Sequence, residues 1–244
     1  MNIALIGYGS MGSVVRRVAE ERGHKIVSII DPKAPEAAAL VPNAEALSDA
    51  DVAVDFSAGE SVLDTIRICK ESGVNLVVGT TGWYDKLQEA KNLAEGIGFL
   101  WSSNFSIGVN IYFKVVEAAA KQMDKFDEYD VWGHEIHHYN KADSPSGTAK
   151  TLEKILLDNI ERKTSAVEDK LDRKRKDEEI HFSSVRGGAV NFGHTIGFDS
   201  AADRILITHE ARSRDGFALG AVKAAEWLKG KKGFFEMQDF LNNN

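Results

Sequence analysis

Residues 2–12 read NIALIGYGSMG, an apolar run of strand length followed by three glycines at the start of a helical pattern. In such a G-x-G-x-x-G turn, Gly7 permits the tight bend, Gly9 lets a pyrophosphate approach the backbone, and Gly12 lets the helix pack closely on the strand. The free amides at the start of the helix would then face the phosphates. The stretch therefore predicts a dinucleotide-binding unit, against the alternative of an ordinary glycine turn.

The alternation of strand and helix continues through the first hundred residues. Helical patterns, with apolar residues three and four positions apart, cover residues 11–22, 61–72 and 86–95. Apolar runs rich in Val, Ile and Leu occupy residues 2–6, 25–30, 52–56, 75–79 and 98–101. This order predicts an α/β fold, a Rossmann-type doubly wound parallel sheet covered on both faces. Ligands of such sheets bind beyond the carboxyl ends of the strands.

Asp31 ends the second predicted strand, about 20 residues after the glycine turn, where an acid holds the ribose hydroxyls of a dinucleotide. An Asp that only begins a turn before Pro32 is the alternative reading. An acid at this place repels a 2′-phosphate, and only Lys33 would supply a positive charge nearby. We therefore expect NADH or NADPH as cofactor, with NADH accepted as readily.

Two further loops follow predicted strands on the expected ligand side. They comprise Gly79, Thr80 and Thr81 after the fourth strand, and Ser103, Asn104, Phe105 and Ser106 after the fifth. By composition alone these are ordinary turns. Because the carboxyl ends of parallel strands meet at one edge of the sheet, their amides and hydroxyls are candidates for lining the nicotinamide.

The pattern changes after residue 104. Helical patterns at 107–123 and 148–160 are interleaved with strand-like segments at 129–138, 180–186, 190–198 and 204–211, and a further helical pattern follows at 220–228. We predict a dinucleotide-binding domain of residues 1–106 with 213–244. Residues 107–212 would form an α+β domain for substrate binding and oligomerisation.

Composition excludes several classes of protein. The 244 residues carry 30 basic and 37 acidic side chains, so the chain lacks the positive charge of a nucleic-acid-binding protein. The single cysteine, Cys69, excludes an internal disulfide and lies in a helical pattern where a packing role is expected. No apolar run approaches the roughly 20 residues that cross a membrane, and no leader pattern is present, so a cytoplasmic protein is expected.

Residues 134–149, HEIHHYNKADSPSGTA, are the most informative stretch of the second half. His137, His138 and Lys141 lie close together, followed by Gly147 and Thr148 at a predicted helix start. A proton donor, an ammonium group and unpaired amides suit a substrate that carries carboxylates. In an extended chain the two histidines point to opposite sides, so one would do chemistry while the other orients the substrate or the loop.

His134, Glu135 and His138 also match H-E-x-x-H, the signature of zinc hydrolases. That signature works on a helix, where both imidazoles share a face. The flanking sequence is typical of a strand that runs into a loop. We therefore expect no metal.

Residues 135–149 resemble the signature of the 4-hydroxy-tetrahydrodipicolinate reductase family, also called dihydrodipicolinate reductase. GTTG at 79–82 and NFSIGVN at 104–110 are similar to the same family, and the resemblance covers essentially the whole chain. It implies reduction of 4-hydroxy-tetrahydrodipicolinate to 2,3,4,5-tetrahydrodipicolinate by NADH or NADPH with loss of water, in lysine and diaminopimelate biosynthesis. A small cyclic dicarboxylate substrate and a homotetramer are implied as well, with no nucleic-acid or membrane partner.

The resemblance also implies individual roles. His137 would be the proton donor or acceptor and Lys141 the proton donor, with His138, Gly147 and Thr148 binding the substrate. The implied cofactor-binding residues are Gly7, Tyr8, Gly9, Ser10, Met11, Gly12, Asp31, Gly79, Thr80, Thr81, Ser103, Asn104, Phe105 and Ser106. Two alternatives remain from the residues alone, namely a Rossmann oxidoreductase for another amino or sugar acid and a cofactor-sensing protein without turnover. Arg186 and His194 are interpreted as structural polar residues, and Phe217 as a hinge or cofactor contact.

Overall fold

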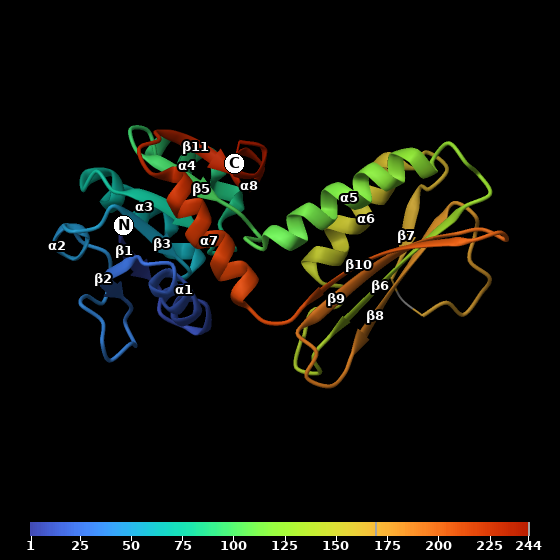
Figure 1. Cartoon of the computed structure of the whole chain (residues 1–244), viewed down its shortest axis with the longest axis horizontal. Coiled ribbons are helices and arrows are strands. Elements are labelled where there is room, and N and C mark those ends of the chain that lie inside the picture. Colours follow the sequence, from blue (N-terminus) through green and yellow to red (C-terminus); the bar gives the residue numbers. More distant parts are fainter. Residues whose placement is uncertain (169, 244) are drawn as a thin grey trace. The chain divides into compact units, whose positions relative to one another are not determined.

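The computed structural model describes residues 1–168 and 170–243, which divide into two compact units. The terminal unit comprises Met1–Ile107 with Arg214–Asn244, and the central unit comprises Gly108–Ser213. Each unit has its own sheet (Figure 1). Among the helices of these described residues, none is long and apolar enough to cross a membrane.

The terminal unit is built on a six-stranded sheet in the order β11-β5-β4-β3-β1-β2, in which every pairing is parallel. The strands are β1 (Asn2–Ile6), β2 (Lys25–Ile30), β3 (Val52–Asp55), β4 (Asn75–Val78), β5 (Gly98–Trp101) and β11 (Gly233–Glu236). The predicted Rossmann-type sheet is confirmed. Its sixth strand comes from the C-terminal part of the chain and pairs with β5.

Helices pack on both faces of this sheet. They are α1 (Ser10–Glu21), α2 (Ala44–Leu47), α3 (Val62–Glu71), α4 (Leu87–Leu93), α7 (Asp215–Leu228) and α8 (Met237–Asn242), with 3-10 turns at Gly59–Ser61 and Tyr84–Lys86. Neighbouring residues of β1 enter opposite cores, since Leu5 belongs to the core with α1 and α7 whereas Ile6 belongs to the core with α3. Side chains alternate along a strand, so a strand covered on both faces is apolar throughout. Cys69 of α3 is fully buried in the second core.

The central unit packs two helices on a five-stranded mixed sheet in the order β10-β9-β6-β8-β7. Its elements are α5 (Ile107–Met123), β6 (Asp130–His137), α6 (Gly147–Asn159), β7 (Ser165–Val167), β8 (Glu179–Arg186), β9 (Phe192–Asp199) and β10 (Arg204–Ala211). The middle strand, β6, runs antiparallel to β9 and parallel to β8. The predicted α+β second domain is confirmed.

Buried and half-buried residues alternate along the whole of β6. Val131, in the buried set, packs with Val116 of α5 and Leu152 of α6, so this set faces the helices. Glu135 and His137 belong to the same set. The strand period therefore directs a carboxylate and an imidazole under the helices, where polar groups need partners.

Candidate functional site

The glycine turn after β1 is held by close backbone packing at two of its three glycines. Gly7 has a positive φ of 83°, and a Cβ there would lie 2.5 Å from the carbonyl oxygen of Phe56. A Cβ on Gly12 would lie 2.2 Å from the carbonyl oxygen of Gly7. A Cβ on Gly9, the N-cap of α1, would have no atom within 4 Å. The turn therefore leaves open space at Gly9, beside the first amides of α1, which have no partners within the helix.

Asp31 lies beside this turn at the end of β2. Its carboxylate accepts hydrogen bonds from the amides of Tyr8 at 2.7 Å, Lys33 at 2.7 Å and Ala34 at 3.0 Å. These bonds, that from Tyr8 above all, hold the pKa of Asp31 below its usual range. The group is therefore a fixed negative charge at the carboxyl edge of the sheet, where it opposes a second anion.

A pocket of about 260 Å³ opens at the same edge of the terminal unit. Its lining is Met11, Phe56, Gly79, Ser102, Ser103, Asn104, Phe105, Arg214 and Phe217. Three segments predicted separately from the sequence meet here: the glycine turn, the loop after β4 and the loop after β5. Phe217 of α7, predicted as a hinge or cofactor contact, lies among them.

Some of the predicted cofactor residues are not part of the lining of this pocket. Thr80 is buried, and its hydroxyl donates to Asp55 at 2.9 Å and accepts from the amide of Ser57 at 2.8 Å. Ser106 is also buried, and its amide donates to Asn104. The Thr80 side chain and the Ser106 amide therefore hold their loops together, whereas Thr81 is exposed.

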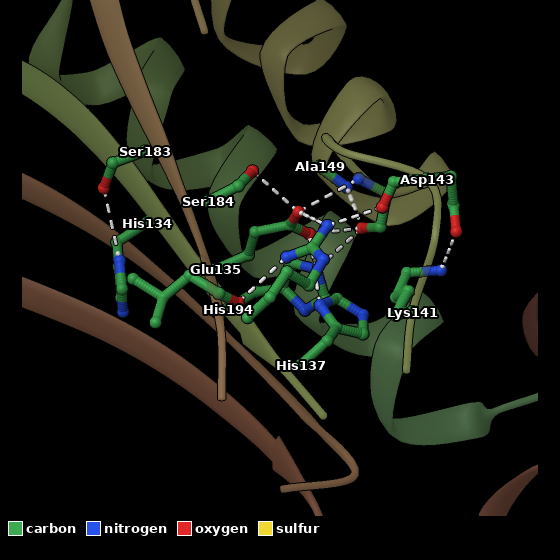
Figure 2. Close-up of polar contacts among 12 residues, drawn as sticks. His134, Glu135, His137, Lys141, Asp143, Ala149, Ser183, Ser184 and His194 are labelled. Atoms are coloured by element: carbon green, nitrogen blue, oxygen red, sulfur yellow. Dashed lines mark hydrogen bonds and ion pairs between the residues drawn. The ribbon is translucent and has the colours of Figure 1, made fainter. Parts of the chain in front are cut away.

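In the central unit, the side chain of Glu135 is fully buried and lies at the centre of a polar cluster (Figure 2). Its Oε1 accepts from the amide of Ser146 at 3.0 Å, from Ser184 Oγ at 2.8 Å and from Arg186 Nη2 at 2.8 Å. Its Oε2 accepts from Ser146 Oγ, and His194 Nε2 lies 3.1 Å away. Burial alone would raise the pKa of Glu135, but the hydrogen bonds, led by that from His194, hold it well below its usual range. The carboxylate is ionised.

Strand register brings these partners together. Glu135 of β6 pairs with Ser184 of the neighbouring strand β8 on one side and with His194 of β9 on the other. His137, two residues further along, pairs with Arg186 of β8. Residues opposite one another in adjacent strands are close enough for their side chains to interact.

His137 is 6% exposed, and its ring stacks on Phe192 with the centroids 5.8 Å apart. Its Nδ1 lies 3.5 Å from Glu135 Oε2. Burial lowers the pKa of His137 to about 4, although the Glu135 carboxylate acts in the opposite direction. The imidazole is therefore neutral at pH 7.

Lys141 lies in the loop between β6 and α6. Its amide donates to the carbonyl of His138 at 3.1 Å, and its Nζ donates to Asp143 Oδ1 at 2.7 Å (Figure 2). The charge of Lys141 adds to the effect of burial in lowering the pKa of His137. The loop is tied down by Arg186, whose Nη2 also donates to the carbonyl of Asp143 at 2.7 Å.

Gly147 and Thr148 form the first turn of α6, as predicted. Ser146 is the N-cap, and its hydroxyl accepts from the amide of Ala149 at 3.1 Å. A Cβ on Gly147 would have no atom within 4 Å, so the backbone there is open to a ligand. An N-terminus of this kind favours an anion.

The sequence H-E-x-x-H lies on a strand followed by a loop. His134 belongs to the half-buried set of β6, where its Nδ1 lies 3.3 Å from Ser183 Oγ, whereas Glu135 is on the opposite face. His134 and His138 are about 13 Å apart along an extended chain, too far to share one ion. Another set, Glu135, His137 and His194, has one donor atom from each within 4.8 Å. A metal ion there would have to displace hydrogen bonds that already occupy Glu135.

The sequence did not identify Glu135 as the central residue of this cluster. The residues alone indicate Glu135 only as part of the H-E-x-x-H match, and they indicate structural polar roles for Arg186 and His194. Both in fact contact Glu135, as does Ser184. The period of two along residues 129–138 was the available signal, because it places Glu135 on the same face as His137.

Comparisons with known proteins agree along the whole chain. Residues 1–105 match the family model described as dihydrodipicolinate reductase, N-terminus, and residues 108–241 match its C-terminal counterpart. A 4-hydroxy-tetrahydrodipicolinate reductase of Christiangramia forsetii is 40% identical over 247 residues, covering 100% of this chain and 98% of its own. One of Archaeoglobus fulgidus is 39% identical over 259 residues, covering 99% and 100%.

A solved structure is similar in fold over the full length. The dipicolinate-bound dihydrodipicolinate reductase of Paenisporosarcina sp. TG-14 aligns with a TM-score of 0.78 and 22% identity, covering 98% of each chain.

Proposed function

Since the chain belongs to the dihydrodipicolinate reductase family, and is an NAD(P)H-dependent oxidoreductase that reduces 4-hydroxy-tetrahydrodipicolinate in lysine and diaminopimelate biosynthesis, we propose which of its residues perform this reaction. The products are 2,3,4,5-tetrahydrodipicolinate, water and the oxidised cofactor. The bound dinucleotide supplies the hydride. The protein has to bind and orient a dicarboxylate, and to deliver one proton.

The terminal unit has a surface that suits a dinucleotide. The open space at Gly9, beside the first amides of α1, would admit a pyrophosphate, and the ionised Asp31 would bind ribose hydroxyls. We assign pyrophosphate contacts to residues 7–12 and nicotinamide contacts to residues 79–81 and 103–106. The convergence of Met11, Gly79 and Ser103 on one pocket carries this assignment. NADH and NADPH are both cofactors in this assignment. NADH binds at least as well as NADPH, because Asp31 opposes a 2′-phosphate.

The loop between β6 and α6 suits a dicarboxylate. The first amides of α6, at Gly147 and Thr148, would receive one carboxylate, and His138 would contact the substrate from the loop. The Paenisporosarcina relative binds dipicolinate, which is a cyclic dicarboxylate. The central unit is therefore assigned as the substrate domain, residues 107–212, and residues 1–106 with 213–244 as the cofactor domain.

Lys141 is the proton donor in this assignment. Its ammonium is held by Asp143 at 2.7 Å and can release a proton to the reduced ring. His137 is neutral at pH 7, so in the free enzyme it is a proton acceptor or hydrogen-bond partner rather than an acid. The dianionic substrate would favour its protonated form when bound.

The assembly we propose is a cytoplasmic homotetramer joined through the central units. Among the strands of the described residues, β10 lies at an edge of its sheet next to β9, and it exposes Ile205 at 42% and Leu206 at 53%. A long edge strand with exposed apolar residues is a template for pairing with another chain. A second copy of the chain is the occupant that this surface fits.

The activity is tested by following NADH and NADPH oxidation separately, with substrate generated in place from pyruvate and aspartate semialdehyde by the synthase that makes it. Substrate-dependent oxidation with either cofactor is expected, with an NADH rate at least equal to the NADPH rate. Absence of oxidation in protein that binds NADH would contradict the proposed substrate.

A further inference from the structure

The residues that we assign to substrate binding and proton transfer lie in different segments of the chain. The hydrogen bonds that hold these segments converge on the carboxylate of Glu135. Glu135 accepts from Ser146, which caps α6, and from Arg186, which also donates to the carbonyl of Asp143 in the Lys141 loop. His137, on the same face of β6, has Nδ1 3.5 Å from Glu135 Oε2.

We propose that Glu135 is the positioning residue of the substrate site, and that its buried carboxylate fixes the start of α6, the Lys141 loop and His137 relative to one another. The inference rests on the proposed roles of His137, Lys141 and Gly147. Glu135 itself is fully buried and acts through these groups.

The link to the carboxylate-binding amides runs through Ser146. Both its amide and its hydroxyl donate to Glu135, while the same hydroxyl accepts from the amide of Ala149. Gly147 and Thr148 lie between these two anchored residues. The hydrogen bonds from Ser146, the N-cap, to Glu135 of β6 therefore hold the amides of Gly147 and Thr148 in place.

The link to the proton donor runs through Arg186. Its Nη2 lies 2.8 Å from Glu135 Oε1 and 2.7 Å from the carbonyl oxygen of Asp143. Asp143 in turn accepts from Lys141 Nζ at 2.7 Å. The Lys141 ammonium is thus connected to Glu135 through two residues.

The arrangement requires a charged acceptor. Ser184, Arg186 and the amide of Ser146 all point donors at Oε1, while the hydroxyl of Ser146 and the ring of His194 occupy Oε2. A glutamine has nearly the same shape, but its NH₂ group would face donors on one side. Glu135→Gln therefore removes the charge and breaks part of the network without leaving a cavity.

The test measures dipicolinate and NADH binding, by calorimetry, together with steady-state kinetics in the full-length protein. We expect Glu135→Gln to weaken dipicolinate binding about tenfold or more and to lower kcat by a similar factor, since a charge-assisted hydrogen bond is worth at least that much. The dissociation constant of NADH should stay within about twofold, because the cofactor residues are in the other unit. The acid limb of the kcat/KM profile should also move, because the charge nearest His137 has been removed.

Two further variants separate the links. Ser146→Ala should raise the KM for substrate more than it lowers kcat, whereas Arg186→Met should lower kcat more than it raises KM. They keep the proposal testable if Glu135→Gln does not fold. Asp158→Asn is the control, because Asp158 is an exposed carboxylate of α6 that pairs with Lys154 and has no bond to the Glu135 cluster among the described residues. It should behave as the wild type.

Wild-type dipicolinate binding and kinetics in Glu135→Gln would overturn the proposal. An equal loss of NADH and dipicolinate binding would indicate general unfolding of that variant. In that case wild-type dipicolinate binding and kinetics in both Ser146→Ala and Arg186→Met would overturn the proposal. A wild-type enzyme that binds dipicolinate but does not oxidise NADH with the substrate would instead contradict the proposed function, and dipicolinate binding would still test Glu135.

Discussion

Nδ1 of His137 lies 3.5 Å from Oε2 of Glu135, and both side chains are buried on the helix-covered face of β6. A carboxylate at this distance favours a charged imidazole, but burial disfavours it more strongly. The free protein therefore holds a neutral histidine beside a negative charge. Such a group can accept a proton when another anion arrives.

His137 should titrate well below an ordinary histidine, because it is buried. With a pKa of about 4 in the folded protein and about 6.5 when unfolded, the unfolded chain binds more protons between these values. The contribution of His137 to the free energy of unfolding is therefore fully present above about pH 6.5 and lost as the pH falls towards 4. NMR of the His137 ring, assigned with His137→Gln, should give a midpoint near pH 4. A midpoint near 6.5 would contradict the buried neutral state.

Replacing Lys141 by Ala should abolish most turnover. General acid catalysis is worth about 10²–10⁴-fold, so kcat should fall by at least about 100-fold. The dissociation constant of NADH should not change. Loss of turnover with unchanged NADH binding distinguishes an enzyme from a cofactor sensor. Lys154→Ala is the control, because Lys154 is an exposed lysine of α6. Turnover of Lys141→Ala at the wild-type rate would show that the proton donor is another group.

The glycines of the turn should separate folding from cofactor binding. Gly12→Ala places a methyl 2.2 Å from a backbone oxygen, so we expect a loss of about 1–3 kcal/mol in the stability of the terminal unit. Gly9→Ala meets no atom within 4 Å. It should unfold like the wild type in calorimetry but bind NADH about tenfold more weakly, since the methyl occupies the pyrophosphate space. Unchanged NADH affinity in Gly9→Ala would contradict that placement.

Asp31 should determine the relative affinities of the protein for NADH and NADPH. Asp31→Asn keeps an acceptor for the loop amides and removes the negative charge. Fluorescence titration should show the ratio of the NADPH to the NADH dissociation constant falling about fivefold or more, since repulsion of the 2′-phosphate is relieved and a charged bond to the ribose is lost. Asp49→Asn, at an exposed acid, should leave the ratio unchanged. An unchanged ratio in Asp31→Asn would remove Asp31 from the ribose site.

The exposed edge strand β10 should form the contact between copies of the chain. Leu206→Glu on β10 should convert the tetramer to smaller species in light scattering coupled to size exclusion, because it places charge in the proposed contact. Leu40→Glu is the control, since Leu40 is an exposed leucine of the terminal unit. A tetramer that persists in Leu206→Glu, or a monomeric wild type, would contradict this interface.

The sequence by itself was sufficient for whatever depends on short-range order. The glycine spacing of residues 7–12, the alternation of apolar strands and helices, and residues 134–149 each require only neighbours along the chain, so local patterns revealed them. The Rossmann-type parallel sheet and the α+β class of the second domain were predictable for the same reason. Residues 233–236 were not predicted as a sixth strand, because their place depends on pairing with β5.

Only the tertiary structure decided what surrounds His137 and Lys141. Ser184, Arg186 and His194 lie 49, 51 and 59 positions beyond Glu135 in the chain, and none belongs to a motif. They meet because β8 and β9 flank β6 in a definite register, which places Ser184 and His194 opposite Glu135. A shift of one residue would turn Glu135 to the other face of the sheet. The burial of Glu135 and His137, which keeps the His137 ring neutral, is therefore a product of long-range strand pairing. That pairing depends on packing across the whole unit.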